Sequence, residues 1–443
     1  MKEPGSYWKN TWKQFRKNKP GLFSFYLLLF FVLLSLSSDF IANKQPYYAK
    51  YRGKIFYPVF QTLFNKNITD STINPATKKY ERLQFDITDW RELQLDKVIW
   101  APIPYSASQK DKYNMQYASP ASTQYYKNAE GKIVNLPFVL KHHLGTNNIG
   151  EDLASGLIHG TSIALKVGLI SMSIAAFFGI LLGAMAGYFG DNKLIINRGS
   201  LLLAIPGIFF GYFYGFIVRF DDLKYAFNTS LSSSLLQLII SLILFTFITL
   251  LLTFAGRLLN KIHFFRRNIY LPIDIFISRL IEIFDSIPAL LLIITISSLF
   301  VEKSLPLVMI IIGCLVAPHI ARLTRAEFLR IRNLEYVQSA RALGYRDVRI
   351  ILKHILPNAL SPLLVYIAFG VANAILAESS LSFLGIGVPA DTVTWGSLLS
   401  SARLDYTAWW MALYPGLAIF ITVAMYNLIG EGIRDALNPK MNT

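Results

Sequence analysis

Residues 335–357 read EYVQSARALGYRDVRIILKHILP and lie between two long apolar runs of the chain. A charged segment this short does not cross a bilayer, so we expect it to lie at the membrane surface with one face open to a partner. Apolar residues recur in it at roughly helical spacing, at Leu343, Val348, Ile351 and Leu352. Basic residues predict the side that faces water, at Arg341, Arg346, Arg349 and Lys353.

Two residues divide this segment. Gly344 interrupts the helical pattern and predicts a break between two short helices. Pro357 is predicted to open the next membrane span, because its missing N–H costs little in the first turn of a helix.

The composition is that of a membrane protein. The 443 residues are 53% hydrophobic, which excludes a disordered chain and most soluble domains. The net charge of +16 does not require nucleic acid as a partner, because Lys and Arg accumulate in the cytoplasmic loops of membrane proteins. The single cysteine, Cys314, excludes an intrachain disulfide and a cysteine-rich metal site.

The chain carries eight apolar runs long enough to span a bilayer. They lie near 21–41, 162–188, 199–218, 231–256, 280–301, 305–324, 358–379 and 408–431. The basic tail 1–20 places the N-terminus in the cytoplasm, and threading eight spans then puts every strongly basic short loop on that same side. We therefore expect both termini in the cytoplasm, with 433–443 as a second cytoplasmic tail.

Two regions outside the apolar runs have distinct compositions. Residues 42–160 are polar, aromatic and rich in proline, which predicts a small, β-containing extracytoplasmic domain. The tail has aromatic residues at helical spacing with basic residues between them, at Trp8, Lys9, Trp12, Lys13, Phe15 and Arg16. This pattern fits an interfacial helix on anionic lipid, and it fits equally a basic tail that only fixes the topology.

Motifs for catalysis are absent from the sequence. It has no phosphate-binding loop, so we expect the chain to bind no ATP, and neither H-E-x-x-H nor G-x-S-x-G occurs. Five residues upstream of the second apolar run match no standard set of metal ligands, and we expect no metal there; they are His142, His143, Glu151, Asp152 and His159.

The 335–357 segment resembles the EAA loop of ABC-importer permeases, which couples the permease to an ATPase. The motif falls on Gln338, Ser339, Ala340, Gly344, His354, Leu356 and Pro357. Gln338 replaces Glu, Ser339 replaces Ala and His354 replaces Ile, whereas the glycine, the Leu-Pro pair and the spacing match. The resemblance implies that these residues, together with Arg346 and Asp347, contact the ATPase.

Further segments resemble the C-type permease of oligopeptide and dipeptide importers. They are WKQFRKNKPGLFSF at 12–25, the stretch 142–168, AESSLSFLGIGV at 377–388 and IGEGIRDALNP at 429–439. Residues 41–60 look most like the subgroup that handles peptides and microcin C. The implied fold is an all-α polytopic membrane protein, with an anchor helix at 21–41 and a type I importer core at 161–432.

The chain departs from this family at one place. The family pattern RxxDxxxxIP, which normally follows the second span closely, falls here on Arg279, Glu282, Ile287 and Pro288. We therefore interpret 199–257 as an inserted transmembrane hairpin, since two extra spans preserve the orientation of everything downstream.

Four charged residues near span ends are candidates for a pathway or gate: Arg279, Glu282, Asp285 and Glu378. Ionisable groups at membrane depth are costly and usually face an aqueous cavity or a partner charge. Glu282 and Asp285, one helical turn apart, fit a pathway that contacts peptide termini or simple interfacial anchoring. For Glu378 we favour anchoring or pairing between subunits.

The resemblance implies a non-catalytic permease subunit of an ATP-driven peptide importer in the bacterial inner membrane. It implies three kinds of partner: a B-type permease that forms the other half of the pathway, cytoplasmic ATPases that hold ATP and Mg, and an extracytoplasmic solute-binding protein. The alternatives are a permease for nickel or another small solute, a secondary transporter, and a membrane-anchored enzyme with its site in 42–160.

Overall fold

The computed structural model describes residues 4–64, 69–73, 80–85, 88–128, 131–300, 303–389 and 391–437. Within these ranges seven helices are long and apolar enough to cross a membrane, and a bent pair of helices makes an eighth if it counts as one span. The spans are Lys19–Leu36, Leu153–Phe189, Arg198–Ile217, Leu231–Leu259, Leu305–Ile331, Asp347–Phe383 and Trp409–Leu437, with the bent pair at Ile273–Ser286 and Ala289–Ser298. Each of the eight predicted apolar runs overlaps one of these, and the polytopic helical fold predicted from the sequence is confirmed.

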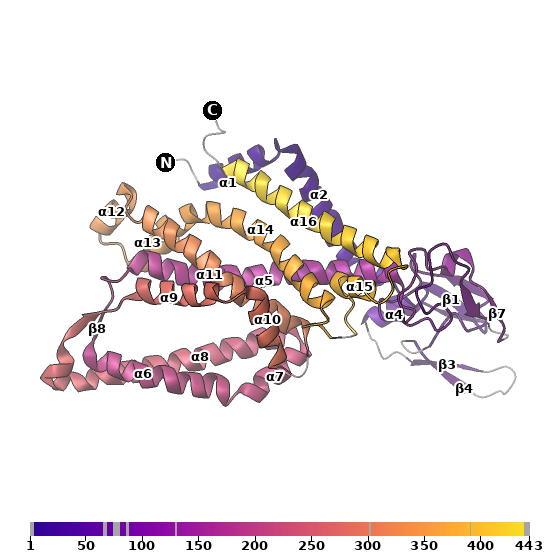
Figure 1. Ribbon diagram of the computed structural model, residues 1–443, viewed down its shortest axis with the longest axis horizontal. Helices are drawn as coiled ribbons and strands as arrows, with labels where there is room; N and C mark the ends of the chain where they lie inside the picture. Colours follow the sequence, from indigo (N-terminus) through magenta and orange to yellow (C-terminus); the bar gives the residue numbers. More distant parts are fainter. Residues whose placement is uncertain are drawn as a thin grey trace.

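The core is built on helices α5 (Leu153–Phe189) and α11 (Leu305–Ile331), which lie along each other (Figure 1). Glycines of α5 allow this close approach: a Cβ on Gly179 or Gly187 would lie 2.6 Å from the Cβ of Ile320 or Phe328. Helices α14 (Leu356–Phe383) and α16 (Trp409–Leu437) complete the packed bundle. The glycine pattern of α5 thus serves an interface within the chain.

The N-terminal segment forms two helices, α1 (Pro4–Phe15) and α2 (Lys19–Leu36), which pack against α16. A short helix, α3 (Ser38–Ile41), follows. Asn18 ends the turn between α1 and α2: its side chain accepts from the Gly21 N–H (2.9 Å) and donates to Asp435 (3.0 Å). The Asn18–Asp435 hydrogen bond joins the N-terminal helices to the C-terminal end of the bundle.

The polar region after α3 contains short antiparallel strands and little helix (Figure 1). Strand β1 (Tyr48–Tyr51) pairs with β2 (Lys54–Phe56) and β5 (Lys97–Ile99). Two further ribbons are β3 (Thr69–Ile73) with β4 (Tyr80–Gln84), and β6 (Tyr125–Lys127) with β7 (Ile133–Asn135). Helix α4 (Pro58–Phe64) and the 3-10 turn η1 (Phe138–Leu140) complete it. A small core of Tyr51, Phe56, Phe85 and Trp90 holds it together, in keeping with the β-containing domain expected here.

The inserted hairpin is enclosed by a two-stranded ribbon, β8 (Ile195–Asn197) with β9 (Asn268–Tyr270). The chain leaves the core at β8 and returns at β9, so the insertion is wider than the 199–257 expected from the sequence. Between the strands lie α6 (Arg198–Tyr212), the wide turn η2 (Phe213–Ile217), α7 (Phe220–Thr229), α8 (Leu231–Ala255), η3 (Gly256–Lys261) and η4 (His263–Arg266).

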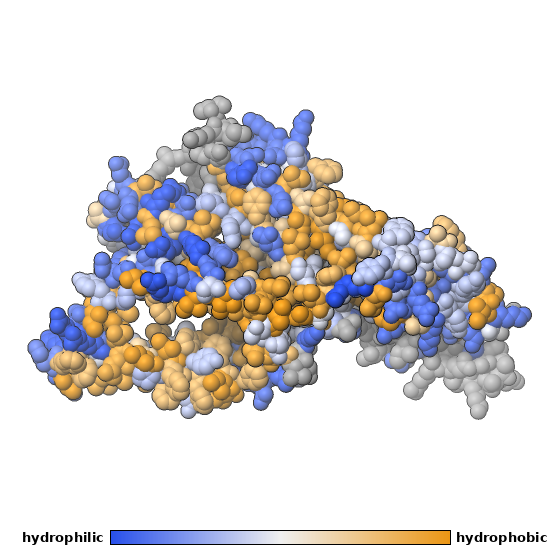
Figure 2. Space-filling model, viewed as in Figure 1, coloured by the Kyte–Doolittle hydropathy of each residue, from blue (hydrophilic) through white to orange (hydrophobic). Residues whose placement is uncertain are grey.

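Helices α6 and α8 pack on each other and stand apart from the core for most of their length (Figure 1). Of the most apolar 18-residue stretch of α8, 6% is buried against protein. Of the corresponding stretch of α11, 67% is buried. The space-filling view accordingly shows a broad hydrophobic surface over the hairpin (Figure 2). The hairpin touches the core through α7, where the ring of Phe227 lies 5.7 Å from that of Phe300.

The apolar run 280–301 is not one straight helix. Helices α9 (Ile273–Ser286) and α10 (Ala289–Ser298) meet at 87°. Ile287 adopts an extended conformation (φ −107°, ψ 129°) because it precedes Pro288, and a residue before proline avoids the α region. The proline that marked a family pattern in the sequence therefore also bends the helix there.

Candidate functional site

The 335–357 segment folds as two short helices, α12 (Glu335–Ala342) and α13 (Asp347–Ile350), separated at Gly344. Gly344 has φ +76°, a conformation that glycine adopts at little cost, and no atom lies within 4 Å of where a Cβ would be. The break predicted from this glycine is confirmed. Among the described residues, the space beside Gly344 is therefore open.

Four buried side chains fasten the segment to the bundle: Val337, Ala340, Ile350 and Ile355. They pack in one cluster with the end of α5 and the end of α11, through Tyr188, Phe328 and Ile331. Sequence reasoning did not single out these residues as anchors, since the helical spacing that it followed selected a different set.

The predicted apolar stripe is exposed. Leu343, Val348 and Leu352 are 72%, 66% and 59% exposed, and only Ile351 packs against the cluster. The basic side chains Arg346 and Arg349 are exposed beside them. The segment thus presents an apolar surface with cations around it, a combination that single-chain packing leaves without a partner.

One carboxylate ties the second short helix to the end of α5. Asp347 accepts hydrogen bonds from the Tyr188 hydroxyl (2.5 Å) and from the Lys193 ammonium (2.6 Å). The same ammonium lies 3.8 Å from the centre of the Tyr188 ring. Nothing local in the sequence marks this contact, because its members are more than 150 positions apart.

Helix α14 begins at Leu356 with Pro357 in its first turn, in line with the prediction that this proline opens the span. A wide turn, η5 (Ile351–Ile355), joins α13 to it. Proline has no N–H to donate to a carbonyl one turn back, and the helix widens just before it. The His354 carbonyl accepts a hydrogen bond from the side chain of Asn358 (2.8 Å). The His354 ring stacks on that of Tyr345, 6.0 Å away.

The remaining motif positions lie on the first short helix and at its base. Gln338 and Ser339 are exposed, and the Gln338 amide donates to the Asn333 carbonyl (3.3 Å). Ala340 faces inward. Of the predicted motif residues, Ala340 is buried in the anchoring cluster and Leu356 packs against it, whereas Gln338, Ser339 and Gly344 are exposed.

The charged residues on α9 form ion pairs. Arg279 and Glu282 pair with each other on the surface at 2.5 Å. Asp285 pairs with Arg322 of α11, and its other oxygen lies 3.7 Å from His319. Near the start of α9, both carboxylate oxygens of Asp274 accept hydrogen bonds from the Arg325 guanidinium of α11. The sequence analysis singled out Glu282 and Asp285 but not Asp274, and it did not predict the partners of Asp285 and Asp274 on α11.

Glu378 is 1% exposed. A residue that anchors at the membrane surface or pairs across a subunit boundary would instead be exposed on the single chain. Its carboxylate accepts from the Ser382 hydroxyl (2.6 Å), with Ser379 and Thr394 close by. Thr394 also caps helix α15 (Trp395–Ser401). Glu378 therefore joins the end of α14 to the loop that precedes α15.

Comparisons with known proteins agree with this architecture. Residues 254–443 match the family model of the binding-protein-dependent transport system inner membrane component, and residues 6–61 match the N-terminal TM domain of oligopeptide transport permease C. A di/tripeptide transport system permease protein of Pseudomonas aeruginosa is 31% identical over 300 residues, 67% of this chain and 72% of that protein. The chain belongs to the binding-protein-dependent transport permeases.

Two other relatives of this permease show how far the likeness extends. The inner membrane ABC transporter permease protein YejE of Escherichia coli is 26% identical over 435 residues, covering 97% of this chain and 96% of that protein. A putative peptide transport system permease protein of Brucella suis is 45% identical over 174 residues, 39% of this chain and 58% of the relative. The permease therefore spans little more than half of the length of that relative, and almost the whole of the E. coli one.

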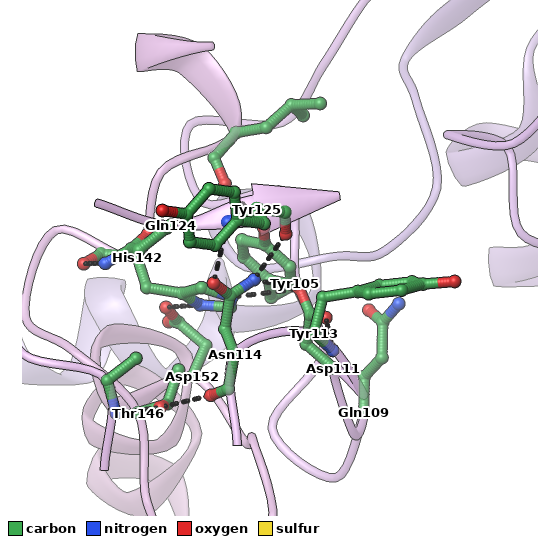
Figure 3. Close-up of polar contacts among 12 residues, drawn as sticks. Tyr105, Gln109, Asp111, Tyr113, Asn114, Gln124, Tyr125, His142, Thr146 and Asp152 are labelled. Carbon is green, nitrogen blue, oxygen red and sulfur yellow. Dashed lines mark hydrogen bonds and ion pairs between the residues drawn. The ribbon is translucent and has the colours of Figure 1, made fainter. Parts of the chain in front are cut away.

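Outside the membrane spans, the permease has a buried polar cluster centred on His142 (Figure 3). The His142 ring nitrogens lie 2.8 Å from an oxygen of Asp152 and 3.2 Å from an oxygen of Asp111. A carboxylate therefore faces each nitrogen, an arrangement that favours the doubly protonated, charged ring. Arg91 lies 3.7 Å from Asp111 and over the Tyr105 ring, and Tyr105 stacks on His142.

This cluster shifts the pKa values of its members. Burial lowers the pKa of His142, but its hydrogen bonds to Asp111 and Asp152 outweigh this and leave it raised. Burial raises the pKa of Asp111, and the hydrogen bonds from His142, Tyr113 and Asn114 reverse the shift, so that its pKa is lowered.

Of the five residues considered as metal ligands, the structure brings together His142 and Asp152 and leaves the other three with separate partners. His142 and Asp152 use their polar atoms within this cluster, whereas His159 bonds to the Ala42 carbonyl (3.0 Å). The Glu151 carboxylate accepts from the Asn147 side chain (2.7 Å), and the His143 ring packs edge-on against Phe138. Asp152 also caps α5 by accepting from the Ser155 N–H (2.6 Å). The cluster therefore joins the strand-rich region to the first residues of α5.

Proposed function

We propose that this permease is the transmembrane subunit of an ATP-driven importer for peptides, and that it forms half of the translocation pathway. The observation that carries the proposal is the 335–357 segment. Its anchored side is buried in the bundle, and its turn at Gly344 is bordered by exposed leucine, valine and arginine side chains. Such a surface suits a cleft on a cytoplasmic ATPase, which would hold the ATP and Mg.

The partners follow from the family. A binding-protein-dependent permease implies a solute-binding protein and an ATPase, and we propose a second, B-type permease as the other half of the pathway. The proposed orientation puts both termini and the 335–357 segment in the cytoplasm, since the basic loops lie there. The chain itself would perform no covalent step.

Peptides are the proposed substrate because the relatives that match this permease are named for them: a di/tripeptide permease in P. aeruginosa and a peptide permease in B. suis. The match to E. coli YejE extends over 97% of the chain from end to end. Transport of nickel or of another small solute remains the alternative, and competition between peptides and such solutes for uptake distinguishes them.

The test of coupling is Gly344→Asp. The substitution forces a side chain into a left-handed backbone conformation and adds a negative charge among the basic side chains of the docking surface. We expect ATP hydrolysis to continue without peptide uptake, at a normal membrane level of the permease. Gly53→Asp is the matched control, because Gly53 has φ +78° and open space around it but lies in the strand-rich region. Normal uptake in Gly344→Asp would contradict the assignment.

A second measurement separates the ATP-driven importer from a secondary transporter. Removal of the cognate ATPase gene should abolish uptake of a labelled tripeptide while an imposed proton gradient is maintained. Uptake that persists under these conditions would show that the permease works without an ATPase.

A further inference from the structure

An apolar pocket of about 430 Å³ lies between the N-terminal helices and the C-terminal half of the bundle. Trp12, Phe15 and Phe25 line one side, and Ile367, Ala368 and Ile433 line the other. Its volume lies within the range of about 300–1,000 Å³ that is typical of small-molecule sites. Neither the coupling segment nor the charged residues of α9 contribute to it.

The walls of the pocket are held by specific contacts. The rings of Trp12 and Phe15 stack at 5.6 Å, and Phe25 meets both edge-on, at 5.5 Å and 6.2 Å. Where α2 crosses α16, a Cβ on Gly21 would lie 3.3 Å from the Cα of Gly432. This crossing and the Asn18–Asp435 hydrogen bond fix the corner between α1 and α2, so the pocket is part of the fold.

The side of the pocket toward α1 is strongly basic. Lys9, Lys13, Arg16, Lys17 and Lys19 are exposed, and residues 4–38 contain no acidic residue. Of the charges on the adjoining end of α16, Asp435 is bonded by Asn18 and lies 3.7 Å from Arg434, and Glu431 is exposed. The balance at the rim is positive, which favours an anion.

The pocket lies just below this basic rim. Phe25 follows Lys19 by six residues of one helix, so it lies about 9 Å further along the axis of a membrane span. A molecule with a negative head and a hydrocarbon chain would meet both features at once. We propose that the pocket binds one acyl chain of an anionic phospholipid whose phosphate contacts Lys9, Lys13 or Arg16.

A helix of another subunit fits the pocket less well. A helix with side chains is about 10–12 Å across, so it would cover the mouth without filling the interior. Such a helix would also have to supply acidic residues to match the rim. An acyl chain fills the interior, and a phosphate supplies the charge.

The first experiment is native mass spectrometry of the purified full-length permease in its complex, isolated from membranes that contain phosphatidylglycerol and phosphatidylethanolamine. We expect phosphatidylglycerol to be retained at least tenfold over its share of the membrane. Ala368→Trp fills the pocket and should remove this retention, whereas Leu417→Trp, at a position of α16 that is 45% exposed, should keep it.

Charge is tested separately from shape. The triple variant Lys9→Gln, Lys13→Gln, Arg16→Gln should lower the preference for phosphatidylglycerol over phosphatidylethanolamine at least fivefold. The matched triple Arg257→Gln, Lys261→Gln, Arg266→Gln removes three exposed cations from the hairpin and should leave the preference unchanged. Equal loss of preference in both triples would contradict a site at α1.

A photo-crosslinking residue at position 368 of the otherwise unaltered permease keeps the test independent of variant folding. Irradiation in native membranes should attach a phospholipid to this position. A crosslink to the second permease would overturn the proposal in favour of a protein contact. Retention of phosphatidylglycerol by Ala368→Trp at the wild-type level would overturn it as well.

Discussion

In the proposed contact between the 335–357 segment and an ATPase, the exposed residues around Gly344 would meet the partner. Leu343 is 72% exposed and contributes nothing to the anchoring cluster. Leu343→Gln should therefore change the stability of the permease by about 0.5 kcal/mol or less, and it should lower co-purification of the ATPase at least fivefold. Leu404→Gln is the control, since Leu404 is 75% exposed near the end of α15. Undiminished co-purification in Leu343→Gln would separate the exposed stripe from ATPase binding.

The His142 cluster predicts a pH dependence at the residue scale. The raised pKa of His142 means that its stabilising contribution is complete below the ordinary imidazole value of about 6.5 and is lost as the pH rises through the raised value. The lowered pKa of Asp111 works in the opposite sense: its contribution is present above the ordinary carboxyl value and is lost as the pH falls through the lowered one. Protection of residues 105–128 and 131–152 against hydrogen exchange, corrected for the intrinsic exchange rate at each pH, should therefore be greatest at mildly acidic pH.

His142→Gln should remove the alkaline limb of this profile and cost about 3 kcal/mol, because it removes the cation that faces Asp152 and leaves Asp111 with Arg91 alone, 3.7 Å away. His143→Gln is the matched control, since His143 is exposed and contacts Phe138 only edge-on. Loss of protection at alkaline pH that is identical in wild type and His142→Gln would assign the titration to another group.

At the residue scale, the sequence predicted what local pattern determines. The break at Gly344 could be predicted because it depends only on the backbone conformation of that residue. The pairing of His142 with Asp111, the contact of Asp347 with Tyr188 and Lys193, and the partner of Asp285 were not predicted. Each joins residues far apart in the chain, and no periodicity within one helix encodes which partner will meet it.

At the scale of elements, the packing of α5 against α11 rests on glycines whose hydrogen atoms face the neighbouring helix. A Cβ on Gly183 would lie 2.6 Å from the Cβ of Thr324. Gly183→Ala should therefore destabilise the permease by about 1–3 kcal/mol through overpacking. Gly416→Ala, within α16 and with no atom within 4 Å of its Cβ, should be neutral or stabilising by about 1 kcal/mol. Thermal unfolding of both variants in the same detergent measures the difference, and equal melting temperatures would show that α5 can move away.

The hairpin is the other element whose role follows from burial. Leu242 lies near the middle of α8, a helix that is mostly turned away from protein. Leu242→Arg should cost about 2.5–3.5 kcal/mol of insertion free energy, so the membrane level of the permease should fall, while relative uptake across a peptide panel stays constant per molecule. Polar changes at Glu282 or Asp285 should alter the panel at normal abundance. A changed peptide preference in Leu242→Arg would place the hairpin in the pathway.

Elements that apolar length defines were predictable, and elements that depend on a bend or a join were not. The eight runs were visible because twenty apolar residues have few other uses. The 87° bend at Ile287–Pro288, the wide turn before Pro357 and the ribbon that closes the hairpin depend on a few backbone positions within continuous apolar or polar stretches. Proline marked two of these places, but it did not tell whether the helix would bend, widen or begin there.

For the whole molecule, the arrangement of the ends predicts the topology. The strand-rich region that contains β1 to β7 lies at one end of the bundle. The 335–357 helices and the β8–β9 ribbon lie toward the other end (Figure 1). Because the second end carries the basic loops, we expect it to face the cytoplasm. With Cys314 replaced by serine, single cysteines at Gly53, Arg266 and Arg349 report on the two sides. A membrane-impermeant maleimide should label intact cells at position 53 only, and permeabilised cells at all three positions. Labelling of position 266 from outside, with 349 protected, would show that the hairpin reverses the chain and that the count of spans before it is wrong.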